Sequence, residues 1–263
     1  MMQSDRIQRL ADELRDARDA AKAVEKLTNR YPDLSVQDAY AIQLVNIDRR
    51  IAAGARIVGK KIGLTSLAMQ NMLGVNEPDY GILLDDMVAK ETDRIDTKKL
   101  IYPRIEGELA FILKKDIEDA PNADIASVLA ATDVIVPSFE IIDSAILNWK
   151  MAIQDTVADN ASSAMLVLGE NRLPVSAIPD LTTVSMVFRK NGDVIDQGVS
   201  SAVMGHPAAA VAWLANKLHE FGIRLKAGEI ILSGSLTKAY DVKAGDVFTA
   251  EFADVGTVTA RFG

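Results

Sequence analysis

The sequence predicts an α+β fold in which a helical N-terminal segment leads into a larger, β-rich body. Apolar residues near the start of the chain recur at three- and four-residue steps, the spacing of one buried helix face. From residue 100 onward, short runs rich in Val, Ile and Phe alternate with turn residues, a pattern typical of strands. No linker rich in Pro, Gly or Ser separates the two parts. We therefore expect one compact unit, with a helical subdomain over 1–54 and a β-rich body over 55–263.

The N-terminal segment is predicted to hold two helices. In the first, one apolar stripe covers 7–27 on an otherwise charged surface, and 31–33 (Tyr-Pro-Asp) ends the helix. Ser35, with Asp38 three residues later, predicts a capped start for the second helix, and Gly54 predicts its end. The buried face of this second helix is expected to carry Tyr40, Leu44, Ile47 and Ile51.

The body is predicted to consist mostly of strands. A strand is expected over 57–62, followed by a short helix over 66–73. Asn191-Gly192 predicts a tight hairpin, because both residues tolerate the positive φ of a type I′ turn. Further strands are expected over 108–113, 134–142, 165–168, 184–188, 229–232, 247–252 and 257–262, and helices over 123–131, 146–154 and 207–221.

The composition excludes several kinds of chemistry. The 263 residues include no Cys and two His, which rules out thiol nucleophiles, Cys-based zinc sites and three-His sites. The formal net charge of −8 argues against a nucleic-acid partner. Residues 1–30 show no apolar signal region, and no run approaches the roughly 20 apolar residues of a membrane helix. The expected location is the cytoplasm, without a membrane partner, and any chemistry is expected to use carboxylates, Lys, hydroxyls and an ion or cofactor.

Nucleotide-binding loops find no support. The segment 54–61 departs from a P-loop, because Lys61 stands where the loop needs the Ser or Thr that binds Mg²⁺. No G-x-G-x-x-G motif is present, so a dinucleotide site is not predicted either.

Carboxylates near apolar strand segments are the most informative candidates for a site. Glu106 and Glu108 are two residues apart, so in a strand they share one face, and such neighbours repel unless a cation lies between them. Glu140 stands inside an apolar run, where glutamate is rarely buried unless it is paired or bound to metal. Three Glu suit Mg²⁺ or Mn²⁺. On spacing alone, ordinary acids on a solvent-facing strand edge and a strand-end Glu140 capped by backbone both stay open.

Two polar segments are further candidates for ligand binding. Residues 154–163 place small polar side chains just before an apolar strand, where a ligand could approach the backbone; a surface loop with an Asx turn is the alternative. Residues 233–236 end a buried strand with a Gly between two hydroxyls, which can hold a carboxylate; a tight turn is the alternative.

Taken in order, five segments resemble the 2-hydroxypenta-2,4-dienoate (2-keto-4-pentenoate) hydratases, which belong to the hydratase/decarboxylase family of the fumarylacetoacetate-hydrolase superfamily. These segments are 59–66, 73–81, 103–108, 155–163 and 233–236. Several long motifs in one order are far more specific than any one of them. The resemblance covers about 35–263 and implies a fumarylacetoacetate-hydrolase-like catalytic body.

The resemblance also implies which residues form the site. The implied ligands of Mg²⁺ or Mn²⁺ are Glu106, Glu108 and Glu140. The implied catalytic residues are Lys61 and Asp79, and the implied substrate-binding residues are Ser162 and Ser235. Lys61 is expected to transfer a proton, whereas Asp79 and Glu106 are alternatives for orienting the water or acting as base. The neighbouring Lys60 is expected to face solvent.

The implied activity is that of a hydro-lyase of the 2-oxopent-4-enoate hydratase type, in aromatic meta-cleavage catabolism. It would add water to 2-hydroxypenta-2,4-dienoate, or a close homologue, and give 4-hydroxy-2-oxopentanoate. Residues 61–63 and 233–236 resemble hydratases more than the sister 4-oxalocrotonate decarboxylases, where Lys-Met-Gly and Thr-Gly-Gly-Ile are usual. That decarboxylase and a non-catalytic partner subunit stay open. Relatives form large homo-oligomers, so a homo-oligomer is expected, with a complex with a decarboxylase or aldolase of the same pathway as a further option.

Overall fold

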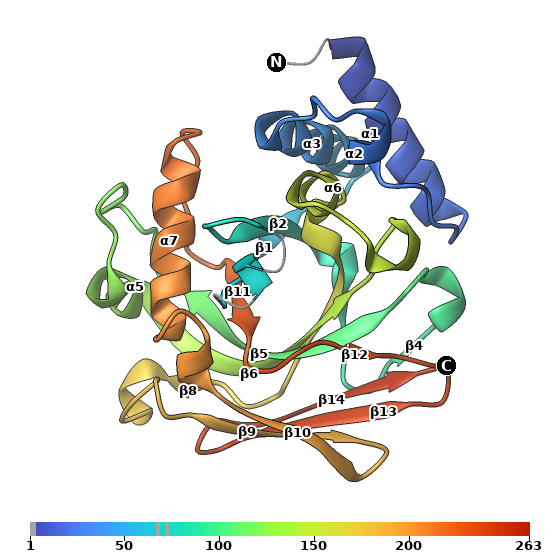
Figure 1. Ribbon diagram of the computed structural model, residues 1–263. Helices are drawn as coiled ribbons and strands as arrows, with labels where there is room; N and C mark the ends of the chain where they lie inside the picture. The colour runs from blue at the N-terminus through green and yellow to red at the C-terminus, as the bar shows by residue number, and fades with distance from the viewer. Residues whose placement is uncertain (1–3, 67–68, 72–73) are drawn as a thin grey trace.

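The computed structural model describes residues 4–66, 69–71 and 74–263 (Figure 1). The helices are α1 (Ser4–Asp19), α2 (Leu27–Arg30), α3 (Val36–Ala52), α5 (Ile125–Ala131), α6 (Ile153–Ala158) and α7 (Pro207–His219). The strands are β1 (Ile57–Gly63), β2 (Asp79–Leu84), β3 (Val88–Ala89), β4 (Arg94–Ile95), β5 (Arg104–Leu113), β6 (Thr132–Ile142), β7 (Ser163–Leu168), β8 (Leu173–Pro174), β9 (Ser185–Lys190), β10 (Asp193–Val199), β11 (Ile230–Ser235), β12 (Tyr240–Asp241), β13 (Val247–Phe252) and β14 (Gly256–Phe262). None of the helices described is long and apolar enough to cross a membrane.

Two sheets form the body of the molecule. The large sheet has the order β2-β1-β11-β5-β6-β7-β3, with β12 beside β5 and β8 beside β6. The small sheet has the order β10-β9-β13-β14-β4. The N-terminal helices lie at the opposite end of the molecule from the small sheet, and α5 and α7 pack together beside β1 and β11 (Figure 1). The predicted α+β class, with helices before a β-rich body, is confirmed.

Alternation along β5 and β6 decides which side of the large sheet carries the charged residues. Gly107 and Phe139 are Cα partners and face the small sheet. A Cβ on Gly107 would lie 2.5 Å from Met186 Sδ of β9, and the Phe139 ring packs on an aromatic ring of the same strand. Because successive side chains of a strand point to opposite faces, Glu106 and Glu108 point away from the small sheet.

Most predicted elements of the body are confirmed, with shifts at their ends. The hairpin at Asn191-Gly192 joins β9 to β10, and these residues have φ values of 54° and 94°. α5 and α7 match two of the predicted helices. β2 has no counterpart in the prediction, because its sequence Asp-Tyr-Gly-Ile-Leu-Leu does not alternate; all six residues are buried. The short helix predicted over 66–73 lies partly outside the described residues.

The second N-terminal helix is confirmed as α3. The Ser35 hydroxyl accepts the N–H of Asp38 at 3.1 Å, and the Asp38 carboxylate accepts the N–H of Ser35. Gly54 follows the helix end with a φ of 110°. The predicted buried face is half wrong, because α3 packs against both α1 and α6 and buries Ala39, Ile42 and Gln43, a face rotated from the predicted one. Of the predicted residues, Tyr40 and Ile47 are buried, whereas Leu44 and Ile51 are 38% and 39% exposed.

The first N-terminal helix is shorter than predicted. α1 ends at Asp19, and the chain then pairs with a distant segment. The N–H of Val24 donates to the carbonyl of Ala145 at 2.8 Å, and the N–H of Leu147 donates to the carbonyl of Val24 at 2.9 Å. The helix predicted over 7–27 is therefore wrong beyond residue 19, because long-range backbone pairing replaces helical hydrogen bonds there.

The same pairing explains a second wrong prediction. Residues 145–147 run extended beside the N-terminal segment, so they do not begin the helix predicted over 146–154. Asn148 and Trp149 then adopt positive φ values of 55° and 56°. α6 begins after these residues, and its Asp155 contacts Thr28 of α2.

Candidate metal centre and active site

Three glutamates lie together on two neighbouring strands of the large sheet. Glu106 and Glu140 are Cα partners across the antiparallel pair of β5 and β6, and Glu108 lies two residues further along the same face of β5. One carboxylate oxygen of each lies within 4.8 Å of the other two. Glu108 and Glu140 are fully buried, and Glu106 is partly exposed. Like charges directly opposite on a sheet destabilise it, so this arrangement requires a compensating cation.

The carboxylate oxygens of this cluster have few donors. Glu108 Oε2 accepts the N–H of Gly234 at 2.8 Å. Glu108 Oε1 and both oxygens of Glu140 have no hydrogen-bond partner among the residues described. Burial raises the pKa of all three carboxyls, and for Glu106 and Glu108 the charge of Glu140 adds to this; the pKa of Glu106 rises to about 7. Buried, unfilled carboxylate oxygens are the donors that hard divalent ions prefer, so the cluster fits Mg²⁺ or Mn²⁺.

Lys61 of β1 reaches this cluster from the neighbouring part of the sheet. Its Nζ lies 3.3 Å from Glu140 Oε2 and donates to the carbonyl oxygen of Ala161 at 3.2 Å. Burial alone would lower the pKa of Lys61, but the charges of Glu140, Asp79 and the other two glutamates outweigh it and raise the pKa. The ammonium is therefore protonated at neutral pH and lies as a cation beside the three glutamates.

Lys60 corrects an expectation from the sequence. It is 5% exposed rather than facing solvent, and its Nζ lies 2.7 Å from Glu229 Oε1. β1 lies inside the sheet between β2 and β11, and both of its consecutive lysines are buried. Alternation turns Lys60 and Lys61 to opposite faces, which separates a structural ion pair from the active-site cluster.

Asp79 begins β2 directly opposite Gly63 of β1. It is 3% exposed, and burial raises its pKa, while the charge of Lys61 and the N–H of Gly63 oppose the rise. A Cβ on Gly63 would collide with Asp79 Oδ1 and lie 3.1 Å from Lys61 Nζ. Glycine at position 63 thus leaves the space in which the Asp79 carboxylate approaches the ammonium.

Ser162 lies in a tight turn beside Lys61. The turn comprises Asn160, Ala161 and Ser162, all with positive φ, and its Ala161 carbonyl accepts from Lys61 Nζ. The Ser162 hydroxyl lies 3.2 Å from Thr156 Oγ1. The structure therefore brings Ser162 next to the ammonium, with its hydroxyl engaged by a neighbouring side chain.

Ser235 ends β11 opposite Glu108 of β5. Its hydroxyl accepts the N–H of Thr237 at 3.4 Å. The preceding Gly234 has a φ of 111° and donates its N–H to Glu108, and a Cβ there would collide with Thr65 Oγ1. The Ser-Gly-Ser segment thus contacts the glutamate cluster through its backbone, which requires glycine at 234.

Comparison with known proteins decides the family. Residues 71–263 match the model for the fumarylacetoacetate (FAA) hydrolase C-terminal family. The chain belongs to the FAA hydrolase C-terminal family. The resemblance that the five motifs indicate is confirmed, as is the expected fold.

Named relatives of this FAA hydrolase family member include hydratases. It is 50% identical to a 2-hydroxypent-2,4-dienoate hydratase of Pseudomonas putida, over 82% of this chain and 97% of the relative. It is 47% identical to a 2-hydroxyhexa-2,4-dienoate hydratase of Comamonas testosteroni, over 97% of this chain and 95% of the relative. A solved 4-oxalocrotonate decarboxylase from Pseudomonas putida G7, complexed with magnesium and adipate, is 37% identical with a TM-score of 0.96, covering 100% of this chain and 99% of the other.

Sequence reasoning missed how this family member uses its segment 154–163. Asp155 is fully buried and accepts the N–H and hydroxyl of Thr28 at 3.0 and 2.8 Å. Asp159 is 3% exposed and binds Arg18 of α1. The alternative prediction of a surface loop is therefore wrong for these two acids, because they attach the N-terminal helices to the body. Their four-residue spacing, which places both on one helix face, is the signal that could have revealed this role.

Proposed function

We propose that this chain is a metal-dependent hydratase, a hydro-lyase that adds water to 2-hydroxypenta-2,4-dienoate or a close homologue such as the hexadienoate. The product would be the corresponding 4-hydroxy-2-oxo acid of aromatic meta-cleavage catabolism. The observation that carries the proposal is the identity of 50% and 47% to relatives named as hydratases of these two substrates. The glutamate cluster, with an ammonium and a further carboxylate beside it, offers the groups that this reaction needs.

Glu106, Glu108 and Glu140 would hold Mg²⁺ or Mn²⁺. The support is their carboxylate oxygens within 4.8 Å of one another, three of which lack donors in the described part of the chain. The similar decarboxylase was solved with magnesium. When bound, such an ion supplies Lewis-acid stabilisation of negative charge on the C2 oxygen of a 2-oxo acid.

During the reaction the C2 enol O–H loses its proton and C5 gains one, and water then adds its oxygen at C4 while its proton is balanced by the proton gained at C3. Lys61 would donate a proton, since the surrounding carboxylates raise its pKa and keep it charged. Asp79 and Glu106 are the alternatives for orienting the water and accepting its proton, because both carboxyls have raised pKa values. Ser162 and Ser235 would donate hydrogen bonds to the substrate carboxylate or the enolate oxygen.

Product analysis tests the proposal. The purified chain is incubated with 2-hydroxypenta-2,4-dienoate, with EDTA or with added Mg²⁺ or Mn²⁺, and the products are separated by chromatography. The 4-hydroxy-2-oxo acid, formed with metal and absent with EDTA, is the expected result. Formation of this product at the same rate in EDTA would contradict the metal requirement, and its absence under all conditions would contradict the activity.

A sister decarboxylase is the second candidate, favoured by the TM-score of 0.96 to the solved 4-oxalocrotonate decarboxylase. The identity to that protein is 37%, below the identity to the two hydratases, which favours hydration. Assay of 2-oxo-3-hexenedioate on the same preparation separates the two. Release of CO₂ without hydration of the dienoate would identify a decarboxylase, and absence of both activities with metal present would identify a non-catalytic partner subunit.

We also propose that the chain works as a cytoplasmic homo-oligomer, with its helical subdomain over 1–54 and its catalytic body over 55–263. Support for assembly comes from large apolar side chains exposed on several elements, such as Leu44 of α3 and Val194 and Val199 of β10. Sedimentation of the chain alone, and mixed with a decarboxylase or aldolase of the same pathway, tests both self-association and a mixed complex.

A further inference from the structure

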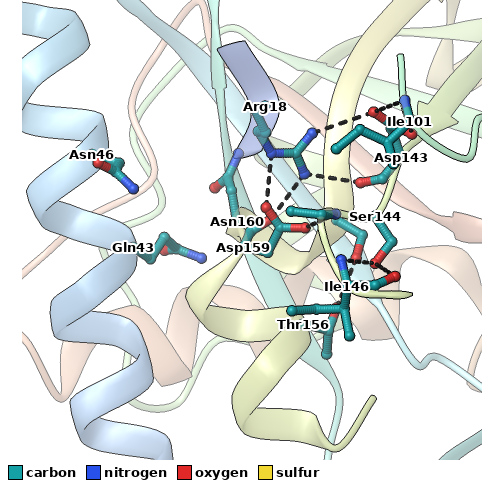
Figure 2. A network of polar contacts seen from close by, with 12 residues as sticks. Arg18, Gln43, Asn46, Ile101, Asp143, Ser144, Ile146, Thr156, Asp159 and Asn160 are labelled. Atoms are coloured by element: carbon teal, nitrogen blue, oxygen red, sulfur yellow. Dashed lines mark hydrogen bonds and ion pairs between the residues drawn. The ribbon is translucent and has the colours of Figure 1, made fainter. Parts of the chain in front are cut away.

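The N-terminal helix α1 places one charged side chain against the body of the molecule (Figure 2). Arg18 Nε donates to Asp159 Oδ1 at 2.7 Å, and one terminal nitrogen donates to the carbonyl oxygen of Asp143 at 2.8 Å. The other terminal nitrogen lies 3.7 Å from Asp143 Oδ2. The two acidic side chains are 1% and 2% exposed, so Arg18 compensates two buried negative charges.

These two aspartates hold both ends of the turn at 160–162. The N–H of Ser162 donates to the carbonyl of Asp159 at 3.0 Å, and the N–H of Asp143 donates to the carbonyl of Ser162 at 2.8 Å. The second carboxylate oxygen of Asp159 accepts the N–H of Ala145 at 2.8 Å. The residues that Arg18 binds are therefore those whose backbone fixes Ser162.

The turn itself has an unfavourable backbone conformation. Asn160, Ala161 and Ser162 have φ values of 56°, 50° and 56°. Residues with a Cβ rarely adopt the left-handed region, and three in succession persist only where the surroundings hold them. The Asn160 side chain contributes by bonding the N–H and carbonyl of Ile82 in β2 at 2.8 and 2.9 Å. Arg18 and its aspartates hold the other end.

The turn also supplies one of the contacts of the active-site ammonium. Lys61 Nζ has the Ala161 carbonyl at 3.2 Å and the Glu140 carboxylate at 3.3 Å. Gly81 allows the turn to approach this closely, because a Cβ there would lie 2.5 Å from the carbonyl oxygen of Asn160. Displacement of the turn would remove the backbone contact of Lys61 and leave its position set by the carboxylates alone.

We propose that Arg18 is a positioning residue for the active site. By compensating Asp143 and Asp159 it holds the left-handed turn, and through the Ala161 carbonyl the turn fixes the Lys61 ammonium. The effect on turnover rests on the proposed function, in which Lys61 transfers a proton. The N-terminal helix then contributes to catalysis through the backbone of the body rather than through contact with substrate.

Three variants test this role. Arg18→Met keeps an unbranched side chain and removes the guanidinium, which lies at a cavity of about 530 Å³ that Arg18, Asp143 and Asp159 help to line. Arg18→Lys keeps the charge. Arg6→Met is the matched control, because it removes a two-bond ion pair from the same helix, with Asp33, within the N-terminal region.

All variants are assayed with saturating metal at a temperature where circular dichroism shows them folded. We expect Arg18→Met to lower kcat by about 10- to 100-fold, the range for an ångström-scale misplacement of a catalytic group. Mn²⁺ affinity should change less than about threefold, since the glutamates lie on β5 and β6 and not on the turn. Arg18→Lys should recover part of kcat, and Arg6→Met should retain it. Amide hydrogen exchange of 160–163, measured without substrate, should rise in Arg18→Met and stay unchanged in Arg6→Met.

Several results would overturn the proposal. They are an unchanged kcat in Arg18→Met, an equal loss in Arg6→Met, and no recovery in Arg18→Lys. If Arg18→Met does not fold, Arg18→Lys carries the same test with a smaller expected loss. If the wild type does not hydrate the dienoate, the proposed function fails, and amide exchange at 160–163 then decides the positioning role by itself: raised exchange supports it and unchanged exchange overturns it.

Discussion

Two clusters of buried carboxylates lie in this molecule, and they differ in how their charges are compensated. In the first, Asp159 accepts from Arg18 and from the N–H of Ala145, and Asp143 accepts from the N–H groups of Ile101 and Tyr102. The second is the glutamate cluster of β5 and β6, where one ammonium, Lys61, pairs with Glu140 and three carboxylate oxygens accept no hydrogen bond in the described part of the chain. Burial of acids therefore does not by itself mark a reactive site; the unfilled oxygens do.

This difference predicts opposite responses to neutralisation. Removing the charge of Arg18 leaves the buried Asp143 and Asp159 without a compensating cation and destabilises the protein. Removing charge from the glutamate cluster relieves repulsion in the metal-free protein and abolishes metal binding.

The largest effect is expected from Glu108→Gln. Metal-dependent turnover should fall by more than about 10³-fold, because the ion contributes several kcal/mol of charge stabilisation. The metal-free variant should at the same time melt above the metal-free wild type, since one of three repelling carboxylates is gone. Steady-state kinetics and calorimetry measure the two. Glu118→Gln, an exposed acid, is the control and should change neither. Normal turnover of Glu108→Gln in chelated buffer would exclude the glutamates as a metal site.

The two consecutive lysines give the next comparison. Lys61→Ala should lower kcat by roughly 10²- to 10⁴-fold, the range for a positioned acid or base. Lys60→Ala should instead lower the melting temperature with little loss of kcat, because Lys60 pairs with Glu229 on the other face of β1. Kinetics and thermal melting of both variants provide the check. Equal kcat values for the two variants would remove Lys61 from the mechanism.

Loss of the ion pairs between Arg18 and its two aspartates should reduce stability whether or not metal is present. Arg18→Met should lower the free energy of unfolding by about 2–3 kcal/mol, below the usual figure for a fully buried pair because the Arg18 side chain is 28% exposed. Urea unfolding with EDTA and with Mg²⁺ measures the loss, which should be the same in both. A loss that appears only with Mg²⁺ would mean that Arg18 acts on the metal site instead.

The glutamate cluster also predicts an unusual pH dependence for the metal-free protein. Burial raises the pKa of Glu106 from 4.5 to about 7, so the folded state holds this proton more tightly than the unfolded state. The contribution of Glu106 to stability should therefore be greatest below about pH 4.5. It should decline as the pH rises to 7, by on the order of 3 kcal/mol. Mg²⁺ should reverse the decline, because it binds the ionised carboxylates. Urea unfolding at pH 5 and 7.5 tests this, and equal stabilisation by Mg²⁺ at both values would contradict it.

The smallest effect is expected from removing the Ser235 hydroxyl, which is proposed to bind the substrate. Ser235→Ala should lower kcat/KM by about fivefold, the worth of one hydrogen bond, and leave the metal affinity unchanged. Ser176→Ala, an exposed hydroxyl, is the control. An unchanged kcat/KM for Ser235→Ala would remove Ser235 from the substrate site.

The parts of the fold predicted from sequence are those with local signals. The cap at Ser35 and the turn at Asn191-Gly192 depend on residues close in sequence, and both are confirmed. The wrong helix boundaries near residues 19 and 146 share one cause, the pairing of Val24 with the 145–147 segment. No local pattern carries that pairing, because its partners are about 120 residues apart.

In the candidate site, too, the features with local sequence signals are predicted and those that depend on distant residues are not. Alternation along one strand predicts Glu106 and Glu108 on one face, and the structure places both beside Glu140. The surroundings of Lys61 depend on a backbone carbonyl at Ala161, whose position reflects three consecutive left-handed residues. The pattern of side chains in the sequence does not predict that the Ala161 carbonyl accepts a hydrogen bond. The contact of Arg18 with Asp143 and Asp159 is not predicted either, because these residues are far apart in the chain.

Anomalous diffraction from crystals grown with Mn²⁺ tests the central claim, that the glutamate cluster is a divalent-metal site. We expect an anomalous peak bounded by Glu106, Glu108 and Glu140 in the wild type, and its loss in Glu108→Gln. A Mn²⁺ peak elsewhere, or an empty cluster at a Mn²⁺ concentration that supports full turnover, would contradict it.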